Sequence, residues 1–111
     1  MKIAFPTNGK GLDSGIEEHF GRARRFLIYN QETREQELVA NPHFSSQDAL
    51  PPELLGRKGA DALVVCDIGK KALEMFDGRG INVYRAVPGN IEENLKKIRQ
   101  GKLSLVLDSN C

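Results

Sequence analysis

Residues 62–66 (Ala-Leu-Val-Val-Cys) form an unbroken apolar run, and this run constrains the fold more than any other feature of the chain. A strand that is exposed on one face alternates apolar and polar residues, whereas a strand covered on both faces is apolar throughout. The run therefore predicts the central strand of a parallel sheet. Because both faces of such a sheet must be covered, helices are expected on each side of it.

Patterns elsewhere predict four more strands and three helices. The predicted strands are residues 2–5, 25–29, 37–40, 62–66 and 81–84. The predicted helices are one that starts near Pro51 and stops by Gly59, one at residues 68–76 and one at residues 91–100. The short polar segment 30–34 predicts an antiparallel hairpin between the second and third strands, and Asn90 is a good N-cap for the last helix. Residues 103–107 fit either a strand added to a sheet edge or a strap packed on the core.

The order of these elements determines the strand directions. Two strands of one sheet that are joined through a helix form a right-handed crossover and run parallel. We therefore predict an α/β fold with a five-stranded mixed sheet, in which the second strand is antiparallel and helices cover both faces. The loops after the parallel strands then meet at one edge. This edge holds His19, His43 and Cys66, and it is where open α/β sheets bind ligands.

Length, charge and cysteine content limit the classes of function. A chain of 111 residues is long enough for one core, so a single domain over residues 1–111 is expected. The net charge of +1, with charges interspersed, argues against nucleic acid or a membrane as partner. Apolar runs are too short to span a membrane and no signal peptide is recognisable, so a cytoplasmic location is expected. Cys66 and Cys111 are too few for a disulfide framework and are expected to be reduced.

Two histidines and one cysteine are candidate metal ligands, and each also has a simpler explanation. His19 is either a ligand, because neutral imidazole binds borderline metals, or a loop histidine with local hydrogen bonds. His43 follows Pro42 in a stiff turn and either supplies a second imidazole or faces water. Cys66 is either a small core residue or, if its sulfur points into the loops, a thiolate ligand for a soft metal.

Glycines and cations near His19 suit an anionic ligand. Gly21 lets the backbone approach a ligand closely, and the adjacent Arg22 supplies positive charge and hydrogen-bond donors. Gly69 and Lys70 lie in the first turn of the predicted helix that follows the strand at residues 62–66, where backbone N–H groups bind anions. Together these residues predict a site for an anionic guest that contains metal.

No recognisable catalytic set accompanies these residues. The chain lacks a Cys-x-x-Cys pair, a Gly-x-x-x-x-Gly-Lys phosphate-binding motif and a Gly-x-Gly-x-x-Gly motif. No carboxylate precedes Asp13, which argues against a two-metal nuclease, and Ser14 is not in a nucleophile elbow. We therefore expect a protein that is not an enzyme.

Over nearly its whole length the chain resembles the dinitrogenase iron–molybdenum cofactor biosynthesis family, which includes NifX, the C-terminal part of NifB and the nitrogenase accessory factors. The matching pieces are residues 2–4 with the glycine-rich loop after them, 19–23 (His-Phe-Gly-Arg-Ala), 68–72 (Ile-Gly-Lys-Lys-Ala), 80–84 (Gly-Ile-Asn-Val-Tyr) and 101–103 (Gly-Lys-Leu). The resemblance implies a three-layer ribonuclease H-like fold. It also implies binding of metal–sulfur clusters, such as iron–molybdenum cofactor or its precursor, with His19 as a contact.

The leading hypothesis is a non-enzymatic carrier that binds an anionic metal–sulfur cluster transiently and exchanges it with a donor or acceptor protein. The expected metal ligands are His19, Cys66 and His43, and the expected cluster contacts are His19, Phe20, Gly21, Arg22, Gly69 and Lys70. The alternative is a regulatory or interaction module that binds a small phosphorylated ligand or a partner ATPase through the same edge. Hydrolysis on a ribonuclease H-like scaffold is a third hypothesis, and it needs clustered carboxylates that the sequence does not reveal.

Overall fold

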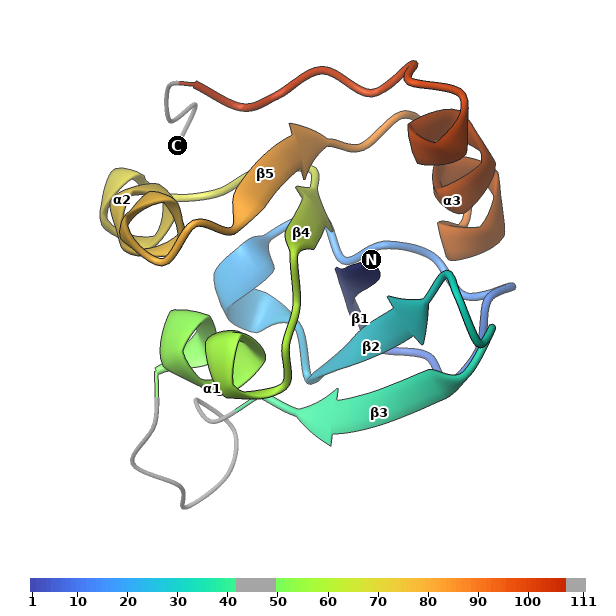
Figure 1. Ribbon diagram of the computed structural model, residues 1–111, viewed down its shortest axis with the longest axis horizontal. Coiled ribbons are helices and arrows are strands. Elements are labelled where there is room, and N and C mark those ends of the chain that lie inside the picture. Colours follow the sequence, from blue (N-terminus) through green and yellow to red (C-terminus); the bar gives the residue numbers. More distant parts are fainter. Residues whose placement is uncertain (42–49, 108–111) are drawn as a thin grey trace.

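The computed structural model describes residues 1–41 and 50–107, which contain a five-stranded sheet with helices on both sides (Figure 1). The strands are β1 (Lys2–Thr7), β2 (Arg25–Asn30), β3 (Gln36–Ala40), β4 (Ala62–Val65) and β5 (Asn82–Arg85). The helices are α1 (Pro51–Arg57), α2 (Lys70–Gly78) and α3 (Ile91–Arg99), with a short 3-10 helix η1 (Phe20–Arg22) before β2. Among the described residues, no helix is long and apolar enough to cross a membrane.

The strands lie in the order β3-β2-β1-β4-β5 across the sheet. β2 pairs antiparallel with both β1 and β3, whereas β1 pairs parallel with β4 and β4 with β5. Only β2 therefore runs against the rest, which confirms the predicted mixed sheet and the predicted hairpin. The apolar run at residues 62–65 is the β4 strand, and all four of its residues are buried between two other parallel strands.

Strand alternation divides the core into two layers, one on each face of the sheet. Ala4, Leu63 and Val65 pack with residues of α1 and α2 on one face. Phe5 and Val64 point to the opposite face, where α3 and the loop after β1 cover them. Figure 1 shows α1 and α2 on one side of the sheet and α3 on the other. The molecule therefore has the three layers that a doubly covered central strand requires.

The start of one helix differs from the sequence prediction, and the start of another agrees with it. Helix α2 begins at Lys70 with Gly69 as its N-cap, two positions after the predicted start, because Ile68 is buried in the preceding turn as part of the core. Helix α3 begins where predicted, and the side-chain oxygen of Asn90 accepts a hydrogen bond from the Glu93 N–H at 2.8 Å.

The segment after α3 wraps around the outer edge of β5 and combines both predicted arrangements. The Arg85 N–H donates to the Ser104 carbonyl at 2.8 Å, and the Val106 N–H donates to the Val83 carbonyl at 2.7 Å. Leu103 packs in the core layer of α3, whereas Val106 packs in the layer of α2. The segment pairs with the edge strand only briefly, so it forms an isolated bridge rather than a sixth strand.

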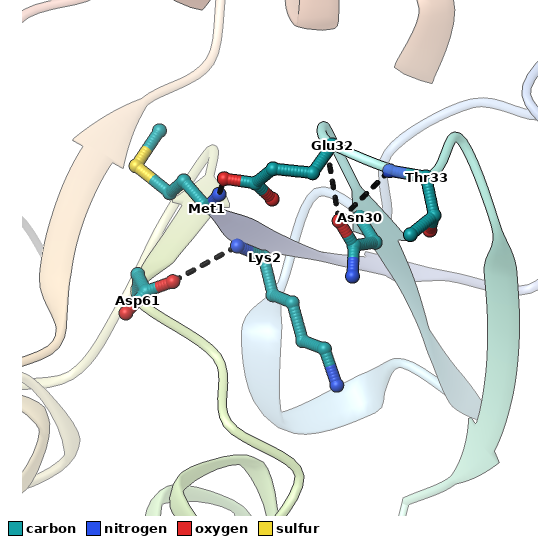
Figure 2. A network of polar contacts seen from close by, with 6 residues as sticks. All are labelled: Met1, Lys2, Asn30, Glu32, Thr33 and Asp61. Atoms are coloured by element: carbon teal, nitrogen blue, oxygen red, sulfur yellow. Dashed lines mark hydrogen bonds and ion pairs between the residues drawn. The ribbon is translucent and has the colours of Figure 1, made fainter.

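The amino-terminal edge of the sheet is held by local polar contacts. Figure 2 shows the Lys2 N–H donating to the Asp61 carboxylate at 2.9 Å and the Met1 ammonium beside the Glu32 carboxylate. The hydrogen bond with this ammonium holds the pKa of Glu32 below its usual range. The Asn30 side-chain oxygen also accepts from the N–H groups in the turn between β2 and β3. These contacts fix the end of the sheet that lies away from the functional candidates.

The fully buried Asn94 of α3 fixes the turn that follows β5. Its side-chain oxygen accepts from the Val87 N–H at 2.8 Å, and its amide nitrogen donates to the Val87 and Asn90 carbonyls, each at 3.0 Å. We expect Asn94→Ala to lower the free energy of unfolding by about 1–3 kcal/mol, because it removes a buried side chain and the partner of the partly buried Val87 N–H and C=O groups. Urea denaturation measures this loss. The exposed Asn82 provides the control, and an equal loss in Asn82→Ala would contradict the explanation.

Candidate functional site

The loop from residue 8 to residue 24 crosses the carboxyl ends of β1 and β4, the edge at which the sequence predicts a site. His19 forms a parallel bridge with Asp67, just after β4. In this bridge the Asp67 N–H donates to the Glu18 carbonyl at 3.1 Å, and the Phe20 N–H donates to the Asp67 carbonyl at 3.3 Å. The bridge adds a short backbone connection beyond the sheet, so His19 and the residues after β4 lie side by side.

The first half of this loop is anchored by buried and charged side chains. The hydroxyl of the buried Thr7 donates to the Gly15 carbonyl at 2.8 Å and accepts from the Gly9 N–H at 3.0 Å. The Arg25 guanidinium donates to the Asn8 and Gly9 carbonyls at 2.6 and 3.0 Å. These contacts attach the first half of the loop to the ends of β1 and β2, just before the segment that carries His19.

His19 is positioned as an accessible imidazole. Its side chain is 48% exposed, and its Nδ1 atom lies 3.8 Å from an oxygen of the Asp67 carboxylate. The Nε2 atom is on the far side of the ring. This distance is within ion-pair range but longer than a hydrogen bond. The half-exposed ring is accessible to a ligand, and the role of His19 as a metal ligand stays a prediction.

The side chain of Phe20, one of the expected cluster contacts, lies in the core rather than at the surface. It is only 6% exposed, and its ring centroid lies 5.5 Å from those of both Phe26 and Phe76. The turn of η1 directs this side chain inward while its neighbours on either side stay exposed. Phe20 thus anchors the motif to β2 and α2, Ala23 is buried as well, and His19, Gly21 and Arg22 are exposed.

Gly21 and Gly69 lie at positions where neither packing nor backbone conformation requires glycine. A Cβ atom at either position would meet nothing within 4 Å, and neither residue has a positive φ. Gly69 is the N-cap of α2, which has no side-chain cap for its first N–H groups. These N–H groups carry partial positive charge at a helix N-terminus. Both glycines therefore leave the backbone open to a ligand.

Two cations accompany these glycines on an open surface. Arg22 is the last residue of η1 and Lys70 is the first residue of α2, and both are exposed. His19 and Gly21 are exposed as well. These residues therefore lie on the surface of the described part of the chain.

The thiol of Cys66 is partly buried and is influenced by the charges of nearby carboxylates and of one arginine. Cys66 follows β4 and is partly buried. Burial raises the pKa of its thiol, and the nearby charges of Asp67, Glu18 and Glu17 raise it further, while Arg85 opposes them. Arg85 also donates to the Cys66 carbonyl at 2.7 Å. At neutral pH the group is thus a thiol, and a metal must displace its proton before it can act as a ligand.

We expect the pH profile of Cys66 alkylation by iodoacetamide to be displaced above that of an ordinary thiol, whose pKa is about 8.5. The raised pKa means that the folded chain holds this proton more tightly than the unfolded chain. The resulting stabilisation is present below the unfolded pKa and is lost as the pH rises through the folded pKa. Peptide mass spectrometry separates Cys66 from Cys111, and the denatured chain is the reference. A midpoint at or below that of the denatured chain contradicts the assignment.

The other expected ligands do not complete a metal site in the part of the chain that the structure describes. His43 lies outside the described residues, as does Cys111. Within residues 1–41 and 50–107, no three side chains of the histidine, cysteine, aspartate and glutamate types are grouped to hold a metal ion. The structure brings His19 to the end of the strand that carries Cys66, and it adds Asp67 as the neighbour of His19. Asp67 is not among the residues that the sequence predicts for the site. Its position directly after the apolar run at residues 62–66, at the end of the central strand, could have indicated that it lies at this edge.

A sequence profile of the family described as "Dinitrogenase iron-molybdenum cofactor" matches residues 1–101. The chain belongs to this family. An uncharacterized protein from Methanocaldococcus jannaschii is 33% identical over 109 residues, which cover 93% of this chain and 89% of that protein. The family match agrees with the resemblance carried by the residues around His19.

Solved structures share the fold of this family member. The apo form of the orange protein from Desulfovibrio gigas superposes with a TM-score of 0.89 at 23% identity, over 99% of this chain and 96% of that chain. A protein from Thermotoga assigned to NifB superposes with a TM-score of 0.84 at 28% identity, over 99% and 97% of the two chains. The predicted α/β architecture is therefore confirmed by its neighbours as well as by the sheet itself.

Proposed function

We propose that this protein is a non-enzymatic carrier that binds an anionic metal–sulfur cluster, of the iron–molybdenum cofactor type or a precursor of it, at the edge formed by η1 and the start of α2. The observation that carries the proposal is the exposed imidazole of His19. It is bridged to the end of β4 and flanked by the Asp67 carboxylate. The name of the family to which the chain belongs supports the class of cargo.

Several groups around His19 suit the charge of such a cluster. The Arg22 guanidinium and the Lys70 ammonium offset negative charge, and the backbone N–H groups near Gly21 and Gly69 can donate to bridging sulfides. Glycine at both positions permits close approach of a bulky guest. In this proposal His19 supplies the coordinate bond, and the other groups supply hydrogen bonds and charge.

A small number of protein ligands is consistent with a carrier. A cluster that must pass to an acceptor protein has to leave its site, and an open surface with one imidazole ligand releases cargo more readily than a closed multidentate site. Cys66 is a secondary ligand at most in this scheme, because burial first, and then the nearby carboxylates, raise its thiol pKa and disfavour the thiolate. The partners are then a cluster donor and a cluster acceptor, neither of which requires nucleic acid or a membrane.

The uncapped N-terminus of α2 gives some support to the alternative function, because it suits any anion. In that case the edge binds a small phosphorylated ligand or the phosphates of a partner ATPase. Lys70 and Lys71 are the exposed cations at this position.

A thermal-shift comparison under anaerobic conditions separates the two functions. The apo protein is heated alone, with iron and tetrathiomolybdate, with inorganic phosphate and with ATP. A ligand present at about 100 times its dissociation constant adds about 2.7 kcal/mol to the stability, so a real ligand raises the melting temperature measurably. The carrier proposal predicts a rise with the metal–sulfur mixture alone. A rise with phosphate or ATP alone supports the alternative and contradicts the carrier.

A further inference from the structure

The two edge strands of the sheet differ in whether another segment of the described chain covers them. The edge of β5 is covered by the segment after α3 through the hydrogen bonds of Arg85 and Val106. β3 forms the other edge, and within residues 1–41 and 50–107 only β2 pairs with it. An unpaired strand presents a row of N–H and C=O groups that can pair with a strand of another chain.

The hydrogen-bond parity of the hairpin identifies which groups of β3 face outward. The Asn41 N–H donates to the Arg24 carbonyl and the Asn30 N–H donates to the Glu35 carbonyl, so odd-numbered residues of this strand bond to β2. The residues whose backbone groups point to the free edge are then Gln36, Leu38 and Ala40. This set is symmetric about Leu38.

Leu38 is also an exposed apolar side chain in the middle of this edge. It is 43% exposed, although it lies opposite the fully buried Leu27 of β2. Natural edge strands often avoid self-pairing by placing a charged residue or proline in the outward-facing positions. β3 has neither a charged residue nor a proline at Gln36, Leu38 or Ala40. Its one charged residue is Glu37, whose backbone groups bond to β2 and whose carboxylate lies 2.7 Å from the Lys58 ammonium.

We propose that β3 pairs antiparallel with β3 of a second copy of this chain, about a twofold axis through Leu38. In this register Leu38 lies opposite its own copy, and Gln36 lies opposite Ala40. All the outward backbone groups of the strand then find partners, and no charge opposes a like charge.

Neighbouring registers are poorer. A shift of the partner strand that places Glu37 opposite its own copy brings two carboxylates together, and like charges directly opposite destabilise a strand pair. A shift in the other direction places Val39 opposite its own copy, and Gln36 then has no partner within the five residues of the strand. A shift toward the hairpin turn reaches Arg34, which has a φ of 66° and cannot continue a strand. The edge therefore specifies a single symmetric pairing.

The paired surface of a five-residue strand is smaller than a standard interface, which buries about 1,600 Å². We therefore expect a weak dimer that forms as the concentration rises. Light scattering coupled to size exclusion, from the micromolar to the millimolar range, should show the mass of the parent chain rising toward twice that of the monomer. Leu38→Val should behave like the parent, whereas Leu38→Lys should stay monomeric, because it places two ammonium groups opposite each other.

Amide hydrogen exchange at the same concentrations gives a second readout. The outward amides of Leu38 and Ala40 should gain protection with concentration, whereas the inward amides of Glu37 and Val39 should be protected throughout. A parent chain that is monomeric at all concentrations overturns the proposal. So does a Leu38→Lys chain that dimerises like the parent, since the contact then lies on another surface.

Discussion

Replacing His19 by alanine is expected to weaken the binding of an anionic metal–sulfur cluster by at least about tenfold, which is the lower limit of the loss seen when only the outer partner of a metal ligand is removed. The reason is that His19 is the one exposed imidazole at the edge within the described residues. The fold should be unaffected, because a half-exposed side chain outside the core contributes little to stability. An anaerobic titration of the apo chain followed by visible absorbance measures the dissociation constant.

Two further variants make the titration specific. His19→Gln keeps a polar side chain but has no imidazole nitrogen, so it should lose binding as His19→Ala does. Arg79→Ala removes an exposed cation at the end of α2 away from Gly69, and it should bind like the parent. If His19→Ala binds the cluster as tightly as the parent, His19 is not a ligand.

Replacing Phe20 by alanine is expected to lower the free energy of unfolding by about 3–5 kcal/mol, the usual cost of removing a buried aromatic side chain. The ring of Phe20 contacts the rings of Phe26 and Phe76, so its loss opens a cavity where η1, β2 and α2 meet. Since small domains are stable by only about 5–15 kcal/mol, a large part of the total stability is at stake. Urea denaturation of parent and variant measures the difference.

The variant Phe20→Leu distinguishes a core role from a ligand role at this position. Leucine retains much of the buried apolar volume, so we expect a smaller loss of stability than with alanine and cluster binding equal to that of the parent. A Phe20→Leu chain that keeps its stability but no longer binds the cluster would show that the ring contacts the cargo, contrary to its buried position.

The topology could be predicted from the sequence because the decisive signals are local. The apolar run at residues 62–65 indicates a strand covered on both faces, and the alternation of strands and helices after it fixes the parallel crossovers. The place of His19 at the carboxyl end of β4 followed from this topology. The start of α2 was less accurate, because the burial of Ile68 in a turn depends on the surrounding core and not on helical periodicity.

The interior of the site could not be predicted, since it depends on contacts between distant segments. Phe20 lies within a polar loop, and only the packing of η1 against α2 shows that it belongs to the core. The raised pKa of Cys66 comes from its burial, from the carboxylate of the adjacent Asp67, and from those of Glu18 and Glu17, which the loop brings to the end of β4. Sequence alone leaves open whether such a cysteine faces a cation or a carboxylate.

Exposure, rather than charge, separates His19 from Cys66. The carboxylate of Asp67 lies 3.8 Å from the His19 ring, and the same carboxylate acts on the Cys66 thiol, so acidic groups lie near both candidate ligands. The His19 side chain is 48% exposed, whereas Cys66 is partly buried and its thiol pKa is raised. His19 therefore ranks above Cys66 as an expected ligand.

The central prediction is that the edge formed by η1 and the start of α2 binds a metal–sulfur cluster. The most direct test is to incubate the apo chain anaerobically with a preformed iron–molybdenum–sulfur cluster, separate the protein by gel filtration, and measure iron and molybdenum in the protein fraction beside its visible spectrum. The account predicts that an equimolar amount of cluster elutes with the parent chain and that much less elutes with His19→Ala. Metal that separates completely from the parent chain would contradict it.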